Sequence, residues 1–123
     1  MQPKIRSLLY DIQQACQVLE DFTKNKTLTD YQQNELLRAG VERKLMIIGE
    51  AVSQILRLDP EYEHTIPNAR EIVGFRNILV HGYFAVQDET VWGIVTTDVP
   101  DCSKEFHRSN HDDPQVRSRK KII

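Results

Sequence analysis

The chain reads Phe75-Arg76-Asn77-Ile78-Leu79-Val80-His81-Gly82-Tyr83 from residue 75 to residue 83. Projected as a helix at about 100° per residue, this stretch places Arg76 in the middle of an apolar face. The apolar positions of that face are Ile72, Val73, Phe75, Leu79 and Val80. Arginine is almost never fully buried without a partner, because its charge is costly to desolvate and cannot be lost. The face must therefore open onto an anion, a carboxylate or a solvated groove beside Arg76.

Arg76 has two interpretations that the pattern leaves open. A buried Arg–Glu pair that fixes the helix register would be purely structural. A guanidinium that faces a groove would instead suit the binding of a phosphate. The neighbours of Arg76 favour the second interpretation.

His81 follows Arg76 by five positions, and histidine is the side chain whose ordinary pKa suits proton transfer near neutral pH. In a straight helix the two side chains would point about 140° apart. Gly82 is a natural helix terminator, so His81 could lie on a loosened last turn. Alternatively, a second copy of the chain could complete the site across a two-fold axis.

The motif Arg-x4-His-x-Tyr, formed here by Arg76, His81 and Tyr83, resembles the signature of HepT-like toxins, which are HEPN-domain ribonucleases. Three further segments resemble the same family, and the similarity extends from the first expected helix to about Pro100. They are Ile-Ile-Gly-Glu-Ala at residues 47–51, Ile-Val-Gly-Phe-Arg-Asn at residues 72–77 and Val-Trp-x-Ile-Val at residues 91–95.

The resemblance implies a metal-independent endoribonuclease that acts as the toxin of a toxin–antitoxin pair. His81 would serve as general base or acid, and Arg76 would stabilise charge on the phosphate. Asn77 would orient one of them or hold the strand, and Tyr83 would stack or hydrogen-bond near the phosphate. The implied partner is a minimal nucleotidyltransferase antitoxin (MntA-like), which neutralises the toxin by AMPylation of Tyr83, in a complex that can be a larger hetero-oligomer.

Glu50 lies next to Gly49, where the lack of a side chain would allow close approach of another helix. The resemblance makes Glu50 a possible support for Arg76, because the Gly49-Glu50 pair would abut the helix that carries the motif. A glutamate on the surface explains the residue equally well.

The hydrophobic spacing predicts an all-α, up-and-down bundle of four to five helices, and the resemblance implies that this bundle is HEPN-like. We expect it to form a symmetric dimer. A first helix is expected from Lys4 to Phe22. A long second helix is expected from Thr29 or Asp30 to Leu58, with Thr29 as N-cap, a kink near Asn34 and a stop at Asp59-Pro60. A loop over residues 61–65 leads to a helix that begins at Pro67 and ends at Gly82. Asp88 is expected to cap a last helix from Glu89 to about Thr97, with Val91, Trp92 and Val95 facing inward.

Composition predicts one helical domain over residues 1–100 and an atypical polar and basic tail over residues 101–123. The formal net charge of −2 excludes a strongly basic surface, so an RNA site must be a local patch. The tail is either an altered C-terminus without a role, which we favour, or a basic arm that contacts RNA.

The sequence contains no apolar run of transmembrane length and no signal peptide, so we expect a cytoplasmic protein without membrane contact. Cys16 and Cys102 are far apart and predict reduced thiols, with Cys16 in the core. No residue spacing indicates a metal site or a cofactor.

Two further functions compete with a nuclease. One is a non-catalytic helical binding partner of a nucleotidyltransferase. The other is a structural helical dimer in which Arg76 pairs with a carboxylate such as Glu50.

Overall fold

The structure is a computed structural model that describes residues 2–82 and 87–100. These residues form helices and no strand, which confirms the predicted all-α class. In chain order the elements are α1 (Pro3–Thr23), α2 (Leu28–Gln33), α3 (Glu35–Leu58), the 3₁₀ turn η1 (Pro60–His64), α4 (Ala69–His81), α5 (Asp88–Gly93) and the π-type turn η2 (Ile94–Asp98).

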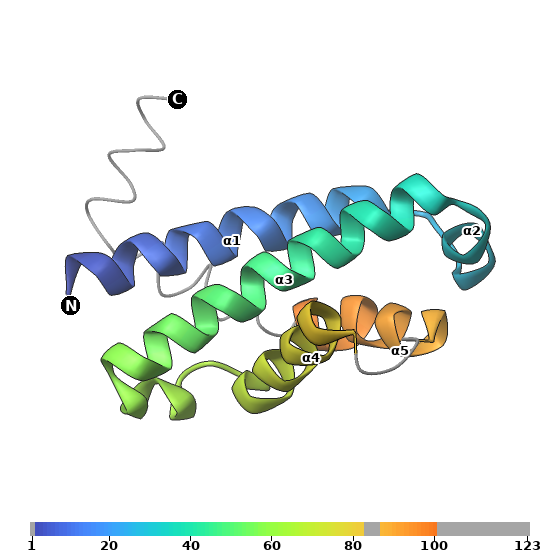
Figure 1. Cartoon of the computed structure of the whole chain (residues 1–123). Helices are drawn as coiled ribbons and strands as arrows, with labels where there is room; N and C mark the ends of the chain where they lie inside the picture. Colours follow the sequence, from blue (N-terminus) through green and yellow to red (C-terminus); the bar gives the residue numbers. More distant parts are fainter. Residues whose placement is uncertain (1, 83–86, 101–123) are drawn as a thin grey trace, which may run out of the picture.

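The long helices α1 and α3 lie side by side as an antiparallel hairpin, joined through the short helix α2 at one end (Figure 1). Helix α4 packs on α3, and α5 packs on α2. The arrangement is the predicted up-and-down bundle, with α3 as the helix shared between α1 and α4.

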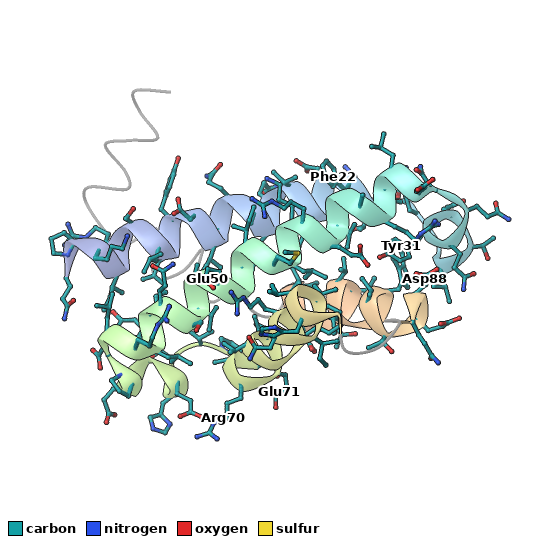
Figure 2. The ribbon with its side chains drawn as sticks, viewed as in Figure 1. Phe22, Tyr31, Glu50, Arg70, Glu71 and Asp88 are labelled. Atoms are coloured by element: carbon teal, nitrogen blue, oxygen red, sulfur yellow. The ribbon has the colours of Figure 1, made fainter. Side chains whose placement is uncertain are left out.

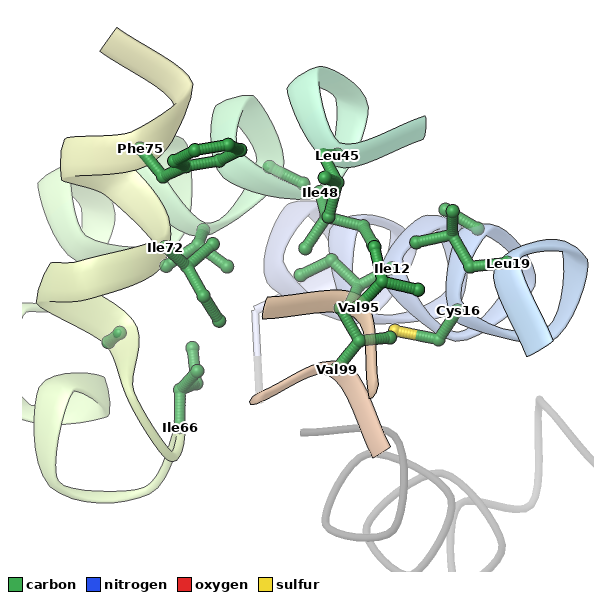
Figure 3. Close-up of a cluster of buried hydrophobic side chains, with 14 of the residues drawn as sticks. Ile12, Cys16, Leu19, Leu45, Ile48, Ile66, Ile72, Phe75, Val95 and Val99 are labelled. Atoms are coloured by element: carbon green, nitrogen blue, oxygen red, sulfur yellow. The ribbon is translucent and has the colours of Figure 1, made fainter. Parts of the chain in front are cut away.

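The core lies between these helices (Figure 3), because each helix carries an apolar stripe that repeats every three to four residues. Cys16 is fully buried with a free thiol, as predicted for a small core residue. The labelled core residues come from α1, α3, α4, η2 and the segment before α4: Ile12, Cys16, Leu19, Leu45, Ile48, Ile66, Ile72, Phe75, Val95 and Val99.

The predicted long second helix is two helices, and its predicted N-cap is wrong. Thr27, not Thr29, caps α2: its hydroxyl accepts a hydrogen bond from the Asp30 N–H, and Asp30 accepts one from the Thr27 N–H. This reciprocal pair is a capping box, which satisfies two helix-terminal donors at once. Asn34 then adopts an extended backbone (φ −122°, ψ 98°), and its side chain caps α3 at Leu37 N–H. The expected kink is therefore a full break.

The helix that carries the motif begins at Ala69 rather than at Pro67. Asn68 has a left-handed backbone (φ 59°), which cannot continue a right-handed helix, so helical bonding begins only when Asn68 C=O accepts from the Ile72 N–H. The helix ends as predicted, with His81 as its last residue and Gly82 in the left-handed region (φ 60°). The predicted loop over residues 61–65 is mostly the turn η1. The Glu61 N–H at the start of this turn donates a hydrogen bond to the Asp59 carboxylate.

The last described helix begins one residue earlier than predicted, because Asp88 is its first residue and Gln87 its cap. The helical segment continues through η2 and residues 99 and 100, so it passes the predicted end at about Thr97. Val91 and Val95 are buried as predicted, whereas Trp92 is only partly buried. Its ring packs against Tyr31 of α2, with centroids 5.4 Å apart. Figure 2 shows Tyr31 and Asp88 at this end of the molecule.

The predictions for Tyr83 and for residues 101–123 fall outside the described residues. Within the described ranges, no helix is both long and apolar enough to cross a bilayer.

Candidate functional site

Gly49 allows α4 to lie directly against the backbone of α3. A Cβ atom built at Gly49 would lie 2.2 Å from Cβ and 2.7 Å from Cγ of Arg76, distances that real atoms do not reach. The sequence suggested this use of Gly49, and the structure places the Gly49-Glu50 pair beside Arg76. The close approach positions the Arg76 side chain along α3.

The Arg76 guanidinium forms an ion pair with Glu50. Its Nη2 lies 2.7 Å from Glu50 Oε2, and its Nη1 donates to Asn77 Oδ1 at 2.9 Å. The side chains of Arg76 and Glu50 are 26% and 40% exposed, so water reaches the pair. Arg76 therefore has the carboxylate partner expected of a structural Arg–Glu pair. It also has the access to water expected of a guanidinium that binds phosphate.

The apolar face of α4 is rotated relative to the helical projection. Ile72 and Phe75 are buried and Leu79 is partly buried, but Val80 is 43% exposed. Arg76 thus lies at the edge of the face rather than in its middle. The first carbons of the Arg76 side chain lie against Gly49 of α3, and the guanidinium reaches Glu50 where water has access.

The Glu50 carboxylate is held at both oxygens. Besides Arg76 at Oε2, its Oε1 accepts a hydrogen bond from Gln54 Nε2 at 3.2 Å and lies 3.6 Å from Arg57 Nη2. The positions of Gln54 and Arg57, four and seven residues after Glu50, put all three side chains on one face of α3. Gln54 and Arg57 were not predicted as partners of Glu50, although their spacing of four and seven residues from Glu50 is visible in the sequence.

His81 is exposed at the C-terminal end of α4. The last turn is regular, because the Gly82 N–H donates to the Ile78 C=O at 2.9 Å. A loosened last turn is therefore excluded, and the five-residue spacing keeps His81 about 140° from Arg76 around the helix. Of the two routes that would unite the two side chains, a second copy of the chain remains.

A hollow of about 310 Å³ opens beside Arg76, and we call it the Arg76 hollow. Its wall combines apolar groups with four charged side chains. It is lined by Leu8 and Asp11 of α1, by Arg43, Met46, Ile47, Glu50, Ala51 and Gln54 of α3, and by Arg76 and Val80 of α4. Asp11 and Arg43 carried no signal in the sequence, because helix contacts between α1 and α3 bring them to this place.

No group of three or more His, Cys, Asp or Glu side chains suited to a metal ion occurs in residues 2–82 and 87–100. The chemistry that the described residues offer is that of a guanidinium, an amide and a carboxylate at one site, with an imidazole on the neighbouring end of the same helix.

The chain matches the family model described as "Ribonuclease HepT-like" over residues 12–108. A relative from Methanocaldococcus jannaschii, named as a candidate RNase, is 37% identical over 82% of this chain and 92% of its own. A "probable ribonuclease HepT" from Thermococcus cleftensis is 34% identical over 84% of this chain and 93% of its own. No solved structure gives a significant match. On the family match and these identities, the chain belongs to the HepT-like ribonuclease family.

Proposed function

We propose that the chain is a metal-independent endoribonuclease whose catalytic groups are Arg76 and His81. Membership of the ribonuclease family supports the reaction class. The observation that carries the assignment of residues is the solvated Arg76–Glu50 pair, which presents a permanent cation at the edge of a hollow.

The proposed reaction uses the ribose of the RNA as its nucleophile. A general base takes the proton of the 2′-hydroxyl, the 2′-oxygen attacks the adjacent phosphorus, and the bond to the 5′-oxygen breaks. The products are a 2′,3′-cyclic phosphate and a 5′-hydroxyl, which receives a proton. His81 performs one of the two proton transfers, and Arg76 stabilises the charge that develops on the phosphoryl oxygens. Asn77, already bonded to Arg76, orients the guanidinium.

The proposed site is composite and lies at the interface of a symmetric homodimer. Two features support a second copy: the regular helix that holds Arg76 and His81 on different sides, and the exposed Val80 beside Arg76. A two-fold axis beside α4 would place both copies of Arg76 and His81 around one cleft. An RNA phosphate in that cleft would offset the repulsion between the guanidiniums.

We further propose that the protein is a cytoplasmic toxin that a minimal nucleotidyltransferase antitoxin neutralises by AMPylation of Tyr83. Tyr83 follows His81 by two positions in the sequence. An added AMP would bring a bulky anion to the cationic site and compete with RNA by charge and by volume. Co-expression with such a partner should add one or more AMP masses, and Tyr83→Phe should abolish the addition. Tyr62→Phe is the control, and a mass increase that persists in Tyr83→Phe would place the modification elsewhere.

The competing function is a non-catalytic helical partner of a nucleotidyltransferase, with Arg76 and Glu50 as a structural pair. The 2.7 Å contact between them is what this alternative requires. Cleavage of single-stranded RNA in excess EDTA separates the two functions. The nuclease requires wild-type cleavage that Arg76→Ala and His81→Ala each abolish. Absence of cleavage in all three proteins would leave the non-catalytic role, whereas equal cleavage in all three would remove Arg76 and His81 from the catalytic site.

A further inference from the structure

We propose that the Arg76 hollow binds one nucleotide of the RNA strand beside the cleaved bond, with Arg43 on its phosphate and Asp11 on its base. The inference rests on the proposed function for the identity of the strand. It adds a substrate-binding site and two binding residues that lie outside the motif.

The first support is the exposed side chain of Arg43, a cation that no described residue neutralises. Arg43 lines the hollow and, among the described residues, forms no hydrogen bond or ion pair. It lies seven residues before Glu50 on α3, which corresponds to about 10 Å along the helix axis. A strand whose scissile phosphate contacts Arg76 would therefore bring a neighbouring phosphate near Arg43. Arginine is suited to this contact because its guanidinium matches the geometry of phosphate oxygens.

The second support is the shape and chemistry of the wall between the two arginines. The wall includes Met46 and Ile47 of α3, which are both only partly buried, so it offers an apolar surface in contact with water. A base is flat and weakly hydrated on its faces, and it gains free energy by covering such a surface. The volume of about 310 Å³ lies at the lower end of the range for small-molecule sites, which suits a single nucleotide.

The third support is the Asp11 carboxylate, which forms no ion pair with any residue that the structure describes. Asp11 of α1 lines the same hollow and has no hydrogen-bond or ion-pair partner among residues 2–82 and 87–100. A carboxylate repels phosphate, so Asp11 is suited to the opposite end of the nucleotide. There it can accept a hydrogen bond from an exocyclic amine, as carboxylates do with the N4 amine of cytosine. Uracil has a carbonyl oxygen in place of that amine, so Asp11 disfavours it.

The test is the binding of two fluorescent single-stranded probes, oligodeoxycytidylate and oligodeoxyuridylate, measured by anisotropy at several salt concentrations. Neither probe has the 2′-hydroxyl that cleavage requires, and their bases differ in the group at position 4, which Asp11 would contact, and in the proton on the adjacent N3. We expect the wild type to prefer the cytidylate probe and Asp11→Asn to remove most of that preference.

Arg43→Ala should weaken both probes about fivefold and reduce the slope of log affinity against log salt by about 0.7, the value for one phosphate contact on a single strand. Lys44→Ala is the matched control: it removes the same charge from the next position of α3 but does not line the hollow. We expect it to stay within about twofold of wild type, because the Lys44 charge lies outside the hollow and salt screens it from the strand.

Equal effects of Arg43→Ala and Lys44→Ala would overturn the phosphate contact, and equal wild-type affinity for the two probes would overturn the role of Asp11. Sedimentation of the same variants tests a second copy as the occupant: a loss of dimer in Arg43→Ala with unchanged probe affinity would also overturn the site. RNA cleavage is a separate readout. If the wild type cleaves RNA but Arg43→Ala binds the probes as wild type does, the nucleotide site is wrong and the proposed nuclease stands. If Arg43→Ala weakens binding but the wild type does not cleave RNA, the nucleotide site stands and the proposed catalysis is wrong.

Discussion

The backbone of Gly49 in α3 lies so close to the side chain of Arg76 in α4 that a methyl group at Gly49 would lie 2.2 Å from the Arg76 Cβ. This contact sets the separation of the two helices and the direction of the guanidinium. It links the packing of the bundle to the geometry of the proposed catalytic site.

Gly49→Ala should therefore destabilise the protein even though alanine is the better helix former. Overpacking costs about 1–3 kcal/mol, which exceeds the gain in helix propensity of up to about 1 kcal/mol. Gly74→Ala in α4 is the control, because its Cβ would meet no atom within 4 Å. Urea denaturation should show a lower free energy of unfolding for Gly49→Ala and a slightly higher one for Gly74→Ala. Equal gains in both variants would mean that α4 does not approach α3 at Gly49.

Arg76→Met should leave the fold intact while it abolishes RNA cleavage. The Arg76–Glu50 pair is partly exposed, so its net contribution to stability is at most about 1 kcal/mol. Methionine can cover the apolar part of the same space without a charge. Thermal unfolding and cleavage of single-stranded RNA should be measured on the same preparation. Loss of the fold would assign Arg76 to structure, and retained cleavage would remove it from the catalytic site.

Val80→Lys should convert the proposed dimer to a monomer, because it would bury a further positive charge beside Arg76 in the interface. Val80 is 43% exposed in the isolated chain, although it follows the apolar face of α4 in the sequence. Leu36→Lys is the control, since Leu36 is 84% exposed and lies at the far end of α3. Sedimentation should give a smaller particle for Val80→Lys only. A monomeric wild type would contradict the dimer itself.

Tyr31→Phe should keep or raise stability at neutral pH. Tyr31 is fully buried, and its hydroxyl has no hydrogen-bond partner among the described residues, so its removal relieves a desolvation cost. Burial, and next Glu42 and Asp88, raise the pKa of Tyr31 above the ordinary value of 10.0. The folded state therefore holds this proton more tightly than the unfolded state does. Its stabilising effect is complete below pH 10 and declines as the pH rises beyond that value.

Melting curves at pH 8 and pH 11 would test this prediction. Between pH 8 and pH 11, the melting temperature of the wild type should fall further than that of Tyr31→Phe. Tyr62→Phe is a weaker comparison, because the pKa of Tyr62 is also raised by burial, but this side chain is only partly buried. Equal losses in wild type and Tyr31→Phe would show that Tyr31 ionises without unfolding the protein.

The sequence predicted the helices well where an apolar stripe and a terminator agree. The Asp59-Pro60 stop and the Gly82 terminator fall where they were expected. The errors occur at helix starts. Thr27 and Thr29 are both sound caps in isolation, and only the reciprocal bond with Asp30 selects Thr27. Pro67 suits a first helical turn, but the left-handed Asn68 delays the helix.

The motif residues could be proposed from the sequence, whereas the wall of the hollow could not. Glu50 and Arg76 are 26 positions apart in the sequence, and the glycine beside Glu50 was the only local sign that they meet. Asp11 and Arg43 come together through the packing of α1 on α3, for which the sequence contains no pairing rule. Such contacts depend on the rotation of each helix, and the exposed Val80 shows that the buried face of α4 differs from its ideal projection.

The most direct test of the account is a mixture of two inactive variants, Arg76→Ala and His81→Ala. If one copy supplies the arginine and the other the histidine, each mixed dimer contains one intact site. Random exchange at equal concentrations should then restore about a quarter of wild-type RNA cleavage in EDTA. If wild type cleaves RNA while the mixture stays as inactive as either variant alone, the composite site is wrong.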